Sequence, residues 1–118
     1  MYYKQETGKS GEELASQYLE KQGYKILDRN FNCHQGEIDI IAKDKDEIVF
    51  IEEKTRTNKK YGFASEAVNE NKQKHLLRAI KYYIYTKKYE NSFIRIDVIE
   101  VYIKNDEINI NHIKQAIE

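Results

Sequence analysis

The chain has 118 residues, of which 40% are hydrophobic and 34% are charged, with a formal net charge of zero. This length suits one core, so we expect residues 1–118 to form a single domain, and the composition excludes a disordered chain. No run approaches the roughly 20 apolar residues of a membrane span, the N-terminus lacks a signal-peptide pattern, and the lone Cys33 excludes an internal disulfide. We therefore expect a cytoplasmic protein without a membrane partner.

The first predicted element is a helix that begins after Ser10 and ends at Gly23. Ser10 and Glu13 form a capping box, in which the two side chains satisfy free amides of the first turn. Apolar residues then recur at helical spacing as far as Leu19. The segment Tyr24–Leu27 is predicted as a short edge strand.

Two strands are predicted at Glu37–Lys43 and Ile48–Lys54, joined by a tight charged turn and paired antiparallel. Their long apolar runs show little alternation, which is typical of strands covered on both faces. Yet they contain Asp39, Glu52 and Lys54. A charge in such a place costs several kcal/mol unless it is paired or binds a metal, so these groups are predicted to act together.

Further along the chain, a loop is predicted at Lys60–Ala64 and a long amphipathic helix at Glu70–Lys87. A core strand is predicted at Phe93–Val101, and a strand–helix–strand order favours parallel pairing of the two strands. A last strand is predicted at Glu107–Asn111 and a final helical turn at Ile113–Ile117. The sum is an α/β fold, a mixed β-sheet flanked by helices.

The net charge of zero conceals an uneven distribution. Residues 54–88 carry ten Lys and Arg against two Asp and Glu, a net of +8, whereas residues 1–53 carry −5 and residues 89–118 carry −3. A basic segment directly after the acidic strands fits a polyanion held close to a bound cation. The alternative is that most of these lysines form a solvated helix face.

Strand geometry indicates what the ionisable groups can do. Glu52 and Lys54 point to one face of their strand and Glu53 to the other, while an antiparallel partner brings Asp39 beside Glu52. Two carboxylates at this spacing suit one Mg²⁺ ion, with the backbone carbonyl of Glu53 as a further ligand. Such a metal lowers the pKa of a bound water, and Lys54 could orient that water or stabilise developing charge. The alternative is a cross-strand salt bridge on a solvated face.

Glu12 borders the apolar stripe of the first helix and could reach over the sheet to complete the site. The alternative is a surface glutamate that the helix dipole favours in a first turn.

The motifs Gly36-Glu37-Ile38-Asp39-Ile40-Ile41 and Val49-Phe50-Ile51-Glu52-Glu53-Lys54-Thr55-Arg56 together resemble the PD-(D/E)xK nuclease superfamily. Within it they are similar to the YraN-like family of predicted endonucleases, a likeness that Gly11-Glu12 and Arg95-Ile96-Asp97-Val98 extend over nearly the whole chain. The resemblance implies a restriction-endonuclease-like α-β-β-β-α-β core, like that of archaeal Holliday-junction resolvases. It also implies Mg²⁺ or Mn²⁺ as cofactor and Asp39, Glu52, Lys54 and Glu12 as catalytic residues.

Residues for nucleic-acid binding are predicted at the end of this motif and on the long helix after it. The resemblance supports Lys72 as a phosphate contact and, more loosely, Gln73 as a glutamine near the site. Lys74 and Arg78 lie on the basic face of the long helix. Thr55 and Arg56 are also predicted to contact phosphate, with a surface ion pair as the alternative for Arg56.

The chain departs from the family pattern at Glu53, where a hydrophobic residue is usual. A charge there needs water or a partner, such as Arg56 or a lysine of the long helix. Asp97 is expected to be structural and to hold a basic partner.

The leading functional hypothesis is a divalent-metal-dependent endonuclease that acts on DNA rather than RNA, including branched or structured DNA. Resolvase-like relatives act as dimers, so a homodimer is one expectation. The first alternative is a nucleic-acid-binding module of the same fold that cuts little or nothing, and the second is a protein-interaction adaptor.

Overall fold

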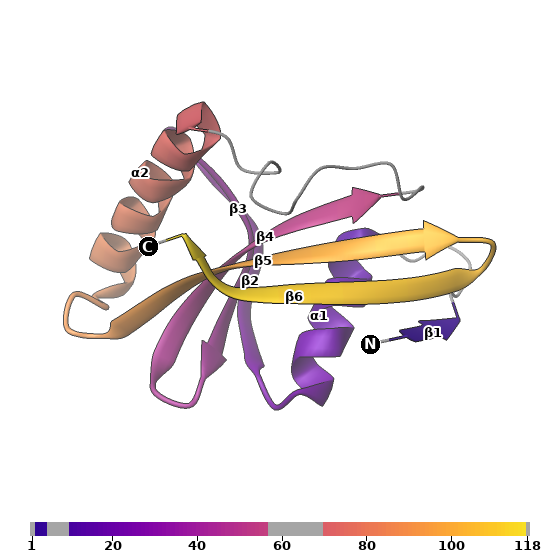
Figure 1. The fold of residues 1–118 in the computed structure, drawn as a ribbon. Coiled ribbons are helices and arrows are strands. Elements are labelled where there is room, and N and C mark those ends of the chain that lie inside the picture. Colours follow the sequence, from indigo (N-terminus) through magenta and orange to yellow (C-terminus); the bar gives the residue numbers. More distant parts are fainter. Residues whose placement is uncertain (1, 5–9, 57–69, 118) are drawn as a thin grey trace.

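A computed structural model describes residues 2–4, 10–56 and 70–117 of the chain. Figure 1 shows its strands as one twisted sheet with the two helices packed against it. The elements in chain order are β1 (Tyr2–Lys4), α1 (Gly11–Lys21), β2 (Lys25–Cys33), β3 (Gly36–Asp44), β4 (Glu47–Arg56), α2 (Glu70–Lys87), β5 (Phe93–Lys104) and β6 (Glu107–Ile117). The loop predicted at Lys60–Ala64 lies outside the described residues.

The six strands form one mixed sheet in the order β1-β6-β5-β4-β3-β2. β4 and β5 are parallel neighbours, and the four remaining neighbouring pairs are antiparallel. The predicted β3–β4 hairpin is thereby confirmed, as is the parallel placement of the strand that follows the long helix. This mixed sheet with two flanking helices confirms the predicted fold class and is compatible with a restriction-endonuclease-like fold.

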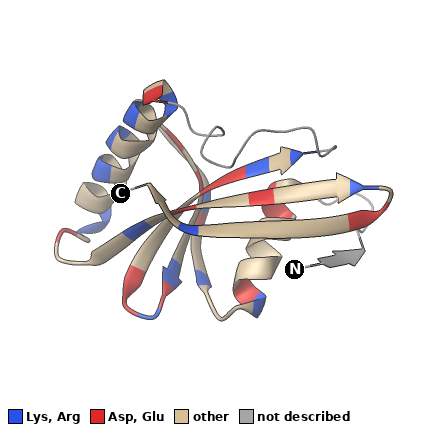
Figure 2. Cartoon of the chain, in the orientation of Figure 1, with Lys and Arg blue, Asp and Glu red and all other residues tan. Residues whose placement is uncertain are grey.

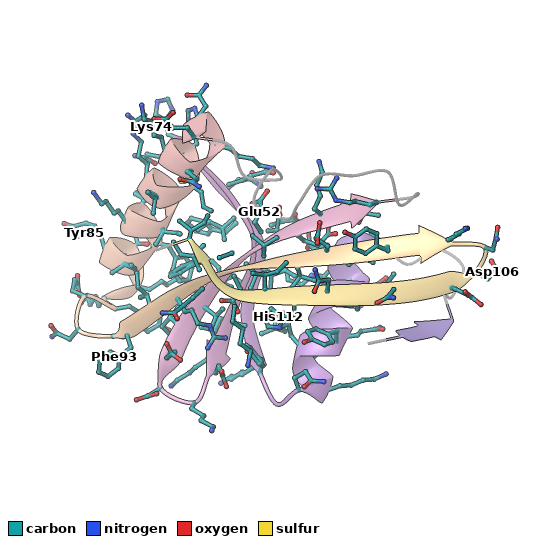
Figure 3. The ribbon with its side chains drawn as sticks, viewed as in Figure 1. Glu52, Lys74, Tyr85, Phe93, Asp106 and His112 are labelled. Carbon is teal, nitrogen blue, oxygen red and sulfur yellow. The ribbon has the colours of Figure 1, made fainter. Side chains whose placement is uncertain are left out.

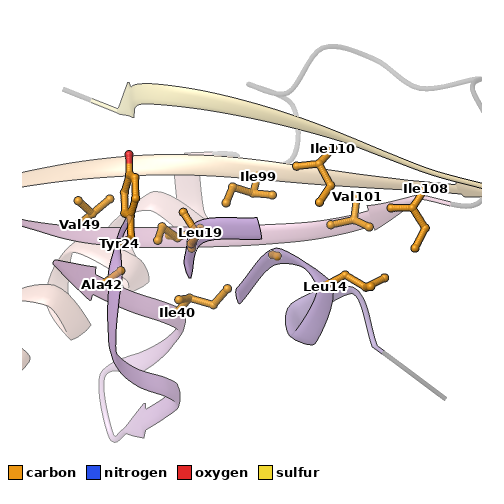
Figure 4. Close-up of a cluster of buried hydrophobic side chains, with 12 residues drawn as sticks. Leu14, Leu19, Tyr24, Ile40, Ala42, Val49, Ile99, Val101, Ile108 and Ile110 are labelled. Carbon is orange, nitrogen blue, oxygen red and sulfur yellow. The ribbon is translucent and has the colours of Figure 1, made fainter. Parts of the chain in front are cut away.

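The two helices cover opposite faces of the sheet, because alternate residues of the central strands feed two separate cores. Leu14, Ala15 and Leu19 of α1 pack in one core with apolar side chains of β3 to β6, among them Ile40 and Ile99 (Figure 4). The other core lies on the opposite face, where the apolar stripe of α2 packs on β3, β4 and β5. This core consists of the helix residues Leu76, Ala79, Ile80 and Tyr83 and the strand residues Ile38, Ile41, Ile48, Phe50 and Ile96.

Local signals correctly predicted the ends of α1 and the β3–β4 turn. The hydroxyl of Ser10 accepts a hydrogen bond from the amide of Glu13 at 3.1 Å, which is half of the expected capping box. Gly23 follows the helix with φ of 94°, a conformation that glycine adopts without the strain of a side chain. In the turn, Lys45 has φ of 57° between the paired residues Asp44 and Glu47.

The edge strand predicted at Tyr24–Leu27 is wrong in its extent. β2 begins at Lys25 and runs to Cys33, paired with β3 along most of its length. Its second half contains four polar residues among the five before Cys33, and Asn30 has φ of 51°, so neither composition nor regular geometry marks it as a strand. Backbone pairing with β3 forms it instead.

The helical turn predicted at Ile113–Ile117 is wrong, because β6 continues to Ile117. Val98 pairs with Ile113 and Ile96 with Ile117, across an irregularity at which the amide of Gln115 donates to Asp97 at 3.0 Å. Five residues do not sustain a helix by themselves, so pairing with β5 decides their conformation. β1, which the sequence did not predict, pairs with the other end of β6.

Neither helix of the described residues has the length and apolar composition needed to cross a membrane.

Candidate metal and nucleic-acid site

Asp39 and Glu52 face each other where β3 and β4 stop pairing. The β3–β4 ladder runs from Asp44 and Glu47 to Ile40 and Ile51 and ends there. One residue further, the carboxylate of Asp39 accepts a hydrogen bond from the backbone amide of Glu53 at 2.8 Å. The side chain of Asp39 therefore takes the place of a ladder bond, and this holds it against β4. We call Asp39 and Glu52 the acid pair.

Asp39 is harder to ionise than an ordinary aspartate, because it is half-buried and lies beside a second carboxylate. Burial and, after it, the charge of Glu52 together raise the pKa of Asp39 to about 7, and the hydrogen bond from the Glu53 amide only partly opposes this. Glu52 is buried, and the Nζ atom of Lys72 lies 2.7 Å from its Oε1 atom. The ammonium of Lys72 is thus paired with Glu52, whereas the pKa of Asp39 is raised by burial and by the charge of Glu52.

Glu52 lies on the face of the sheet that α2 covers. Glu52 and Lys54 follow Phe50 at intervals of two residues, and Phe50 belongs to the core under α2. Lys72 reaches Glu52 from the first turn of that helix. Lys54 is exposed beside Glu52 on the same face, so the two predicted partners on β4 share one face of the sheet.

Glu53 lies on the opposite face, against the start of α1. Its Oε2 atom accepts a hydrogen bond from the hydroxyl of Thr55 at 2.8 Å. Burial raises its pKa, and the charges of Glu12 and Glu52 act in the same direction. The helix comes so close here that a Cβ atom on Gly11 would overlap the Thr55 hydroxyl. The expected partner of Glu53 was Arg56 or a helix lysine, but the hydrogen bond comes from Thr55.

Glu12 lies near Glu53 and forms an ion pair with a residue of β2. Its Oε1 atom lies 3.0 Å from Nε of Arg29, in an ion pair that is partly exposed. Within residues 2–4, 10–56 and 70–117, no three Asp, Glu, His or Cys side chains converge in a way that could hold a metal. The structure brings Asp39 and Glu52 together but does not join Glu12 to them, and its catalytic role stays a prediction.

Arg56, a predicted phosphate contact, is buried in an ion pair. Its Nε atom lies 3.1 Å from Oε2 of Glu100 on β5, and the other oxygen of Glu100 accepts from Asn111 at 3.0 Å. The side chains of Arg56 and Glu100 are only 9% and 2% exposed. This is the ion-pair alternative, although buried rather than on the surface. Thr55 is exposed, and its hydroxyl donates to Glu53.

The remaining predicted contacts lie on α2, and they follow one another along its outer side. Lys74, Arg78 and Lys81 are exposed, and Gln73 is half-buried. Figure 2 shows the basic residues distributed along α2, and Figure 3 places Lys74 at the end of the helix that is nearer to Glu52. A basic surface therefore starts beside the acid pair and continues along the helix.

A buried polar network that the sequence indicated only in part lies on the α1 side of β5. The guanidinium of Arg95 donates to both oxygens of Asp97, at 2.9 and 3.0 Å, and to the hydroxyl of Tyr24 at 2.7 Å. Nε2 of His112 lies 2.7 Å from Asp97, and its Nδ1 atom lies 3.0 Å from the hydroxyl of Tyr18.

The network confirms the basic partner that was expected for Asp97. Burial raises the pKa of Asp97, but hydrogen bonds from His112, Arg95 and the amide of Gln115 outweigh it and hold the pKa below its ordinary value. The spacing Arg95-x-Asp97 on one strand face was the available signal. His112 and the two tyrosines come from elements distant in the sequence, so no sequence signal indicated that they take part in the network.

The sequence is similar over most of its length to curated proteins of one family. The sequence model described as Uncharacterised protein family UPF0102 matches residues 11–101. A UPF0102 protein of Caldicellulosiruptor saccharolyticus is 50% identical over 115 residues, which are 96% of this chain and 98% of that protein. UPF0102 proteins of Caldanaerobacter subterraneus and Clostridium botulinum are 44% and 47% identical, over 96% and 99% of this chain and 95% and 98% of theirs.

Among solved structures, one described as the crystal structure of SSO0001 aligns with 89% of this chain. The TM-score is 0.29 and the sequence identity 19%, and the alignment spans 48% of that chain.

Proposed function

The chain belongs to the protein family UPF0102, and from the acid pair we propose that it is a divalent-metal-dependent endonuclease. It would hydrolyse phosphodiester bonds of DNA, including branched or structured DNA, as a member of the PD-(D/E)xK nuclease superfamily. The single observation that carries the proposal is the geometry of Asp39 and Glu52. Two half-buried or buried carboxylates repel each other at the end of a strand ladder, beside an exposed lysine and a basic helix.

The residues present fit a hard divalent cation. Buried carboxylates on neighbouring strands are costly without a counter-charge, as the raised pKa of Asp39 indicates. Oxygen ligands of this kind suit Mg²⁺ or Mn²⁺. Asp39 and Glu52 would hold the ion, with the backbone carbonyl of Glu53 as a third oxygen. When bound, such an ion supplies an acidified water and neutralises charge on a phosphate.

Lys54 supplies the remaining chemistry from this chain. It follows Glu52 on the same face of β4 and is exposed, so its ammonium can meet a phosphate group placed over the acid pair. A positive charge at that point would stabilise the negative charge that develops on the phosphate oxygens during hydrolysis. It could also orient the attacking water by a hydrogen bond.

The basic surface along α2 supports a nucleic acid as the substrate. Lys74, Arg78 and Lys81 are exposed on the helix whose first turn carries Lys72 to Glu52. Phosphates bound along this surface would lead the chain of the nucleic acid to the acid pair. DNA rather than RNA, and a homodimer with two paired sites, belong to the proposal through the resemblance to resolvases.

The test is cleavage of labelled linear, single-stranded, flapped and four-way DNA by purified protein with Mg²⁺ or Mn²⁺. We expect wild type to cut at least one of these substrates, and Glu52→Ala and Lys54→Ala to abolish the cleavage. Glu107→Ala, a change to an exposed glutamate at the start of β6, is the control and should cut normally. Cleavage that survives both site variants would exclude this site.

A second candidate function is a nucleic-acid-binding module that does not cut. The Lys72–Glu52 ion pair favours it, because a lysine already neutralises one of the two carboxylates. Salt-sensitive DNA binding without cleavage by the wild-type protein would support this alternative.

A further inference from the structure

The acid pair already has a cation of the protein's own beside it. The Nζ atom of Lys72 lies 2.7 Å from Oε1 of Glu52, in a geometry typical of a strong charge-assisted hydrogen bond. The Glu52 side chain is 9% exposed, whereas that of Lys72 is 43% exposed. One partner is therefore fixed in the sheet, and the other reaches in from the surface of α2.

Formal charge makes this lysine a competitor of a divalent cation. Asp39, Glu52 and Lys72 together carry a net charge of about −1 when all three are ionised. A divalent cation that joined them would leave a net charge of about +1 and would place the ammonium beside the metal. If Lys72 turned outward instead, the cation and the two carboxylates would balance. Because its side chain is nearly half exposed, Lys72 can be rehydrated without repacking the core.

We propose that Lys72 is an exchangeable counter-ion of the acid pair. It neutralises Glu52 while the site lacks a metal, and a divalent cation displaces it toward solvent, where it binds a phosphate group of the nucleic acid. The inference rests on the proposed function and adds to it a coupling between metal and substrate. Since binding free energies are reciprocal, the metal strengthens phosphate binding, and phosphate strengthens metal binding by the same factor.

Amine labelling tests the exchange directly. Brief treatment of the intact protein with an acetylating reagent, followed by peptide mass spectrometry, reports how accessible each lysine is. We expect Mg²⁺ to increase the labelling of Lys72 and subsequent addition of a DNA duplex to decrease it. Lys104, an exposed residue at the end of β5, should react at the same rate in all three states. Unchanged or decreased labelling of Lys72 at saturating Mg²⁺ would overturn the proposal.

Calorimetric titration supplies the second readout and does not depend on cleavage. Lys72→Gln should bind Mg²⁺ about five-fold more tightly than wild type, because the competing ammonium is gone. Lys87→Gln removes the same charge from the far end of the helix and should match wild type. In wild type, Ca²⁺ should strengthen binding of a short DNA duplex, and Lys72→Gln should lose most of that effect.

The outcomes separate this inference from the proposed function. Mg²⁺ binding to wild type that requires Asp39 and Glu52 but leaves Lys72 paired would overturn the exchange alone. Absence of any Mg²⁺ or Mn²⁺ binding would overturn the metal-dependent function and the exchange together.

Discussion

At the scale of single residues, Asp39 has a strongly raised carboxyl pKa. Burial and the charge of Glu52 raise its pKa to about 7, from an ordinary value of 3.8. A carboxyl whose pKa rises on folding favours the folded state at low pH, and this contribution is lost as the pH rises through about 7. The metal-free protein therefore carries an unfavourable charge above neutral pH.

Asp39→Asn tests whether the charge of Asp39 destabilises the metal-free protein, because asparagine keeps an oxygen for the Glu53 amide and removes the charge. We expect it to stabilise the metal-free protein by about 1–2 kcal/mol at about pH 8, after allowance for solvent screening, and by almost nothing at about pH 4. Denaturant unfolding in the presence of a chelator at both pH values measures the difference. A loss of stability at pH 8, or an equal gain at both, would contradict it.

A site residue was predictable from the sequence when its signal is local, and it was not when its partner lies on a distant strand. Asp39 and Glu52 could be found because charges inside apolar strands are costly wherever the strands pack. Arg56 could not be assigned, because its partner Glu100 lies on β5 and only the parallel register of β4 and β5 brings them together. Glu53 was recognised as unusual, but its hydrogen bond comes from Thr55, two residues along the same strand, which was not among the predicted partners.

At the scale of elements, the close contact between α1 and β4 fixes how the helix begins over the sheet. A Cβ atom on Gly11 would overlap the Thr55 hydroxyl and lie 2.9 Å from Oε2 of Glu53. Residue 11 approaches β4 without a side chain at this point, so a larger residue there would require the side chains of Thr55 and Glu53 to move. This contact positions Glu12 as well.

We expect Gly11→Ala to destabilise the protein by about 1–3 kcal/mol through overpacking, despite the better helix propensity of alanine. Thermal or denaturant unfolding measures the loss. Combining it with Thr55→Ala removes the nearest obstructing atom, so the double variant should lose less than the sum of the two single losses. Strictly additive losses would show that the crowding lies elsewhere.

The Arg95–Asp97–His112 network holds the second half of β6 onto β5. Asp97 is completely buried, and its carboxylate binds two side chains and the Gln115 amide. We expect Asp97→Ala to cost about 3–5 kcal/mol, because it leaves the buried guanidinium of Arg95 without its main partner. Denaturant unfolding measures this, and Glu107→Ala, an exposed change on the same strand pair, serves as the matched control.

The same variant separates a structural from a catalytic role. The network lies on the α1 side of the sheet, away from the face that carries Glu52. Any Asp97→Ala protein that remains folded should therefore bind Mn²⁺ with wild-type affinity. Selective loss of metal binding by folded protein would contradict a purely structural role for Asp97.

Elements with their own periodic pattern were predicted from sequence, and elements formed by pairing were not. α2 has the predicted bounds, and β3 and β4 lie close to theirs, because their hydrophobic patterns are local. β2 was underestimated and the end of β6 was misassigned as helical, because neighbouring strands supply their hydrogen bonds. Such partners cannot be deduced from a short polar segment alone.

At the scale of the whole molecule, Glu52, Lys54 and the basic surface of α2 lie on the same side of the sheet, the side away from α1. The sequence indicated this arrangement by placing a block of net charge +8 directly after the acidic strands. It could not indicate which lysines share that side, since this depends on how α2 packs.

We expect the double variant Lys74→Gln, Arg78→Gln to bind duplex DNA more weakly, with a salt dependence reduced by about two in the slope of log affinity against log salt. Fluorescence anisotropy at several salt concentrations gives this slope. The matched control is Lys43→Gln, Lys104→Gln, which removes two exposed lysines from β3 and β5. Equal slopes for the two double variants would exclude α2 as the DNA-binding surface.

The central claim is that Asp39 and Glu52 form a divalent-cation site, and titration of the purified protein with Mn²⁺ tests it most directly. Our account predicts one bound ion per acid pair, with binding lost in Asp39→Asn and in Glu52→Gln and retained in Glu107→Ala. Wild-type protein that binds no Mn²⁺, or variants that bind it as tightly as wild type, would contradict the account.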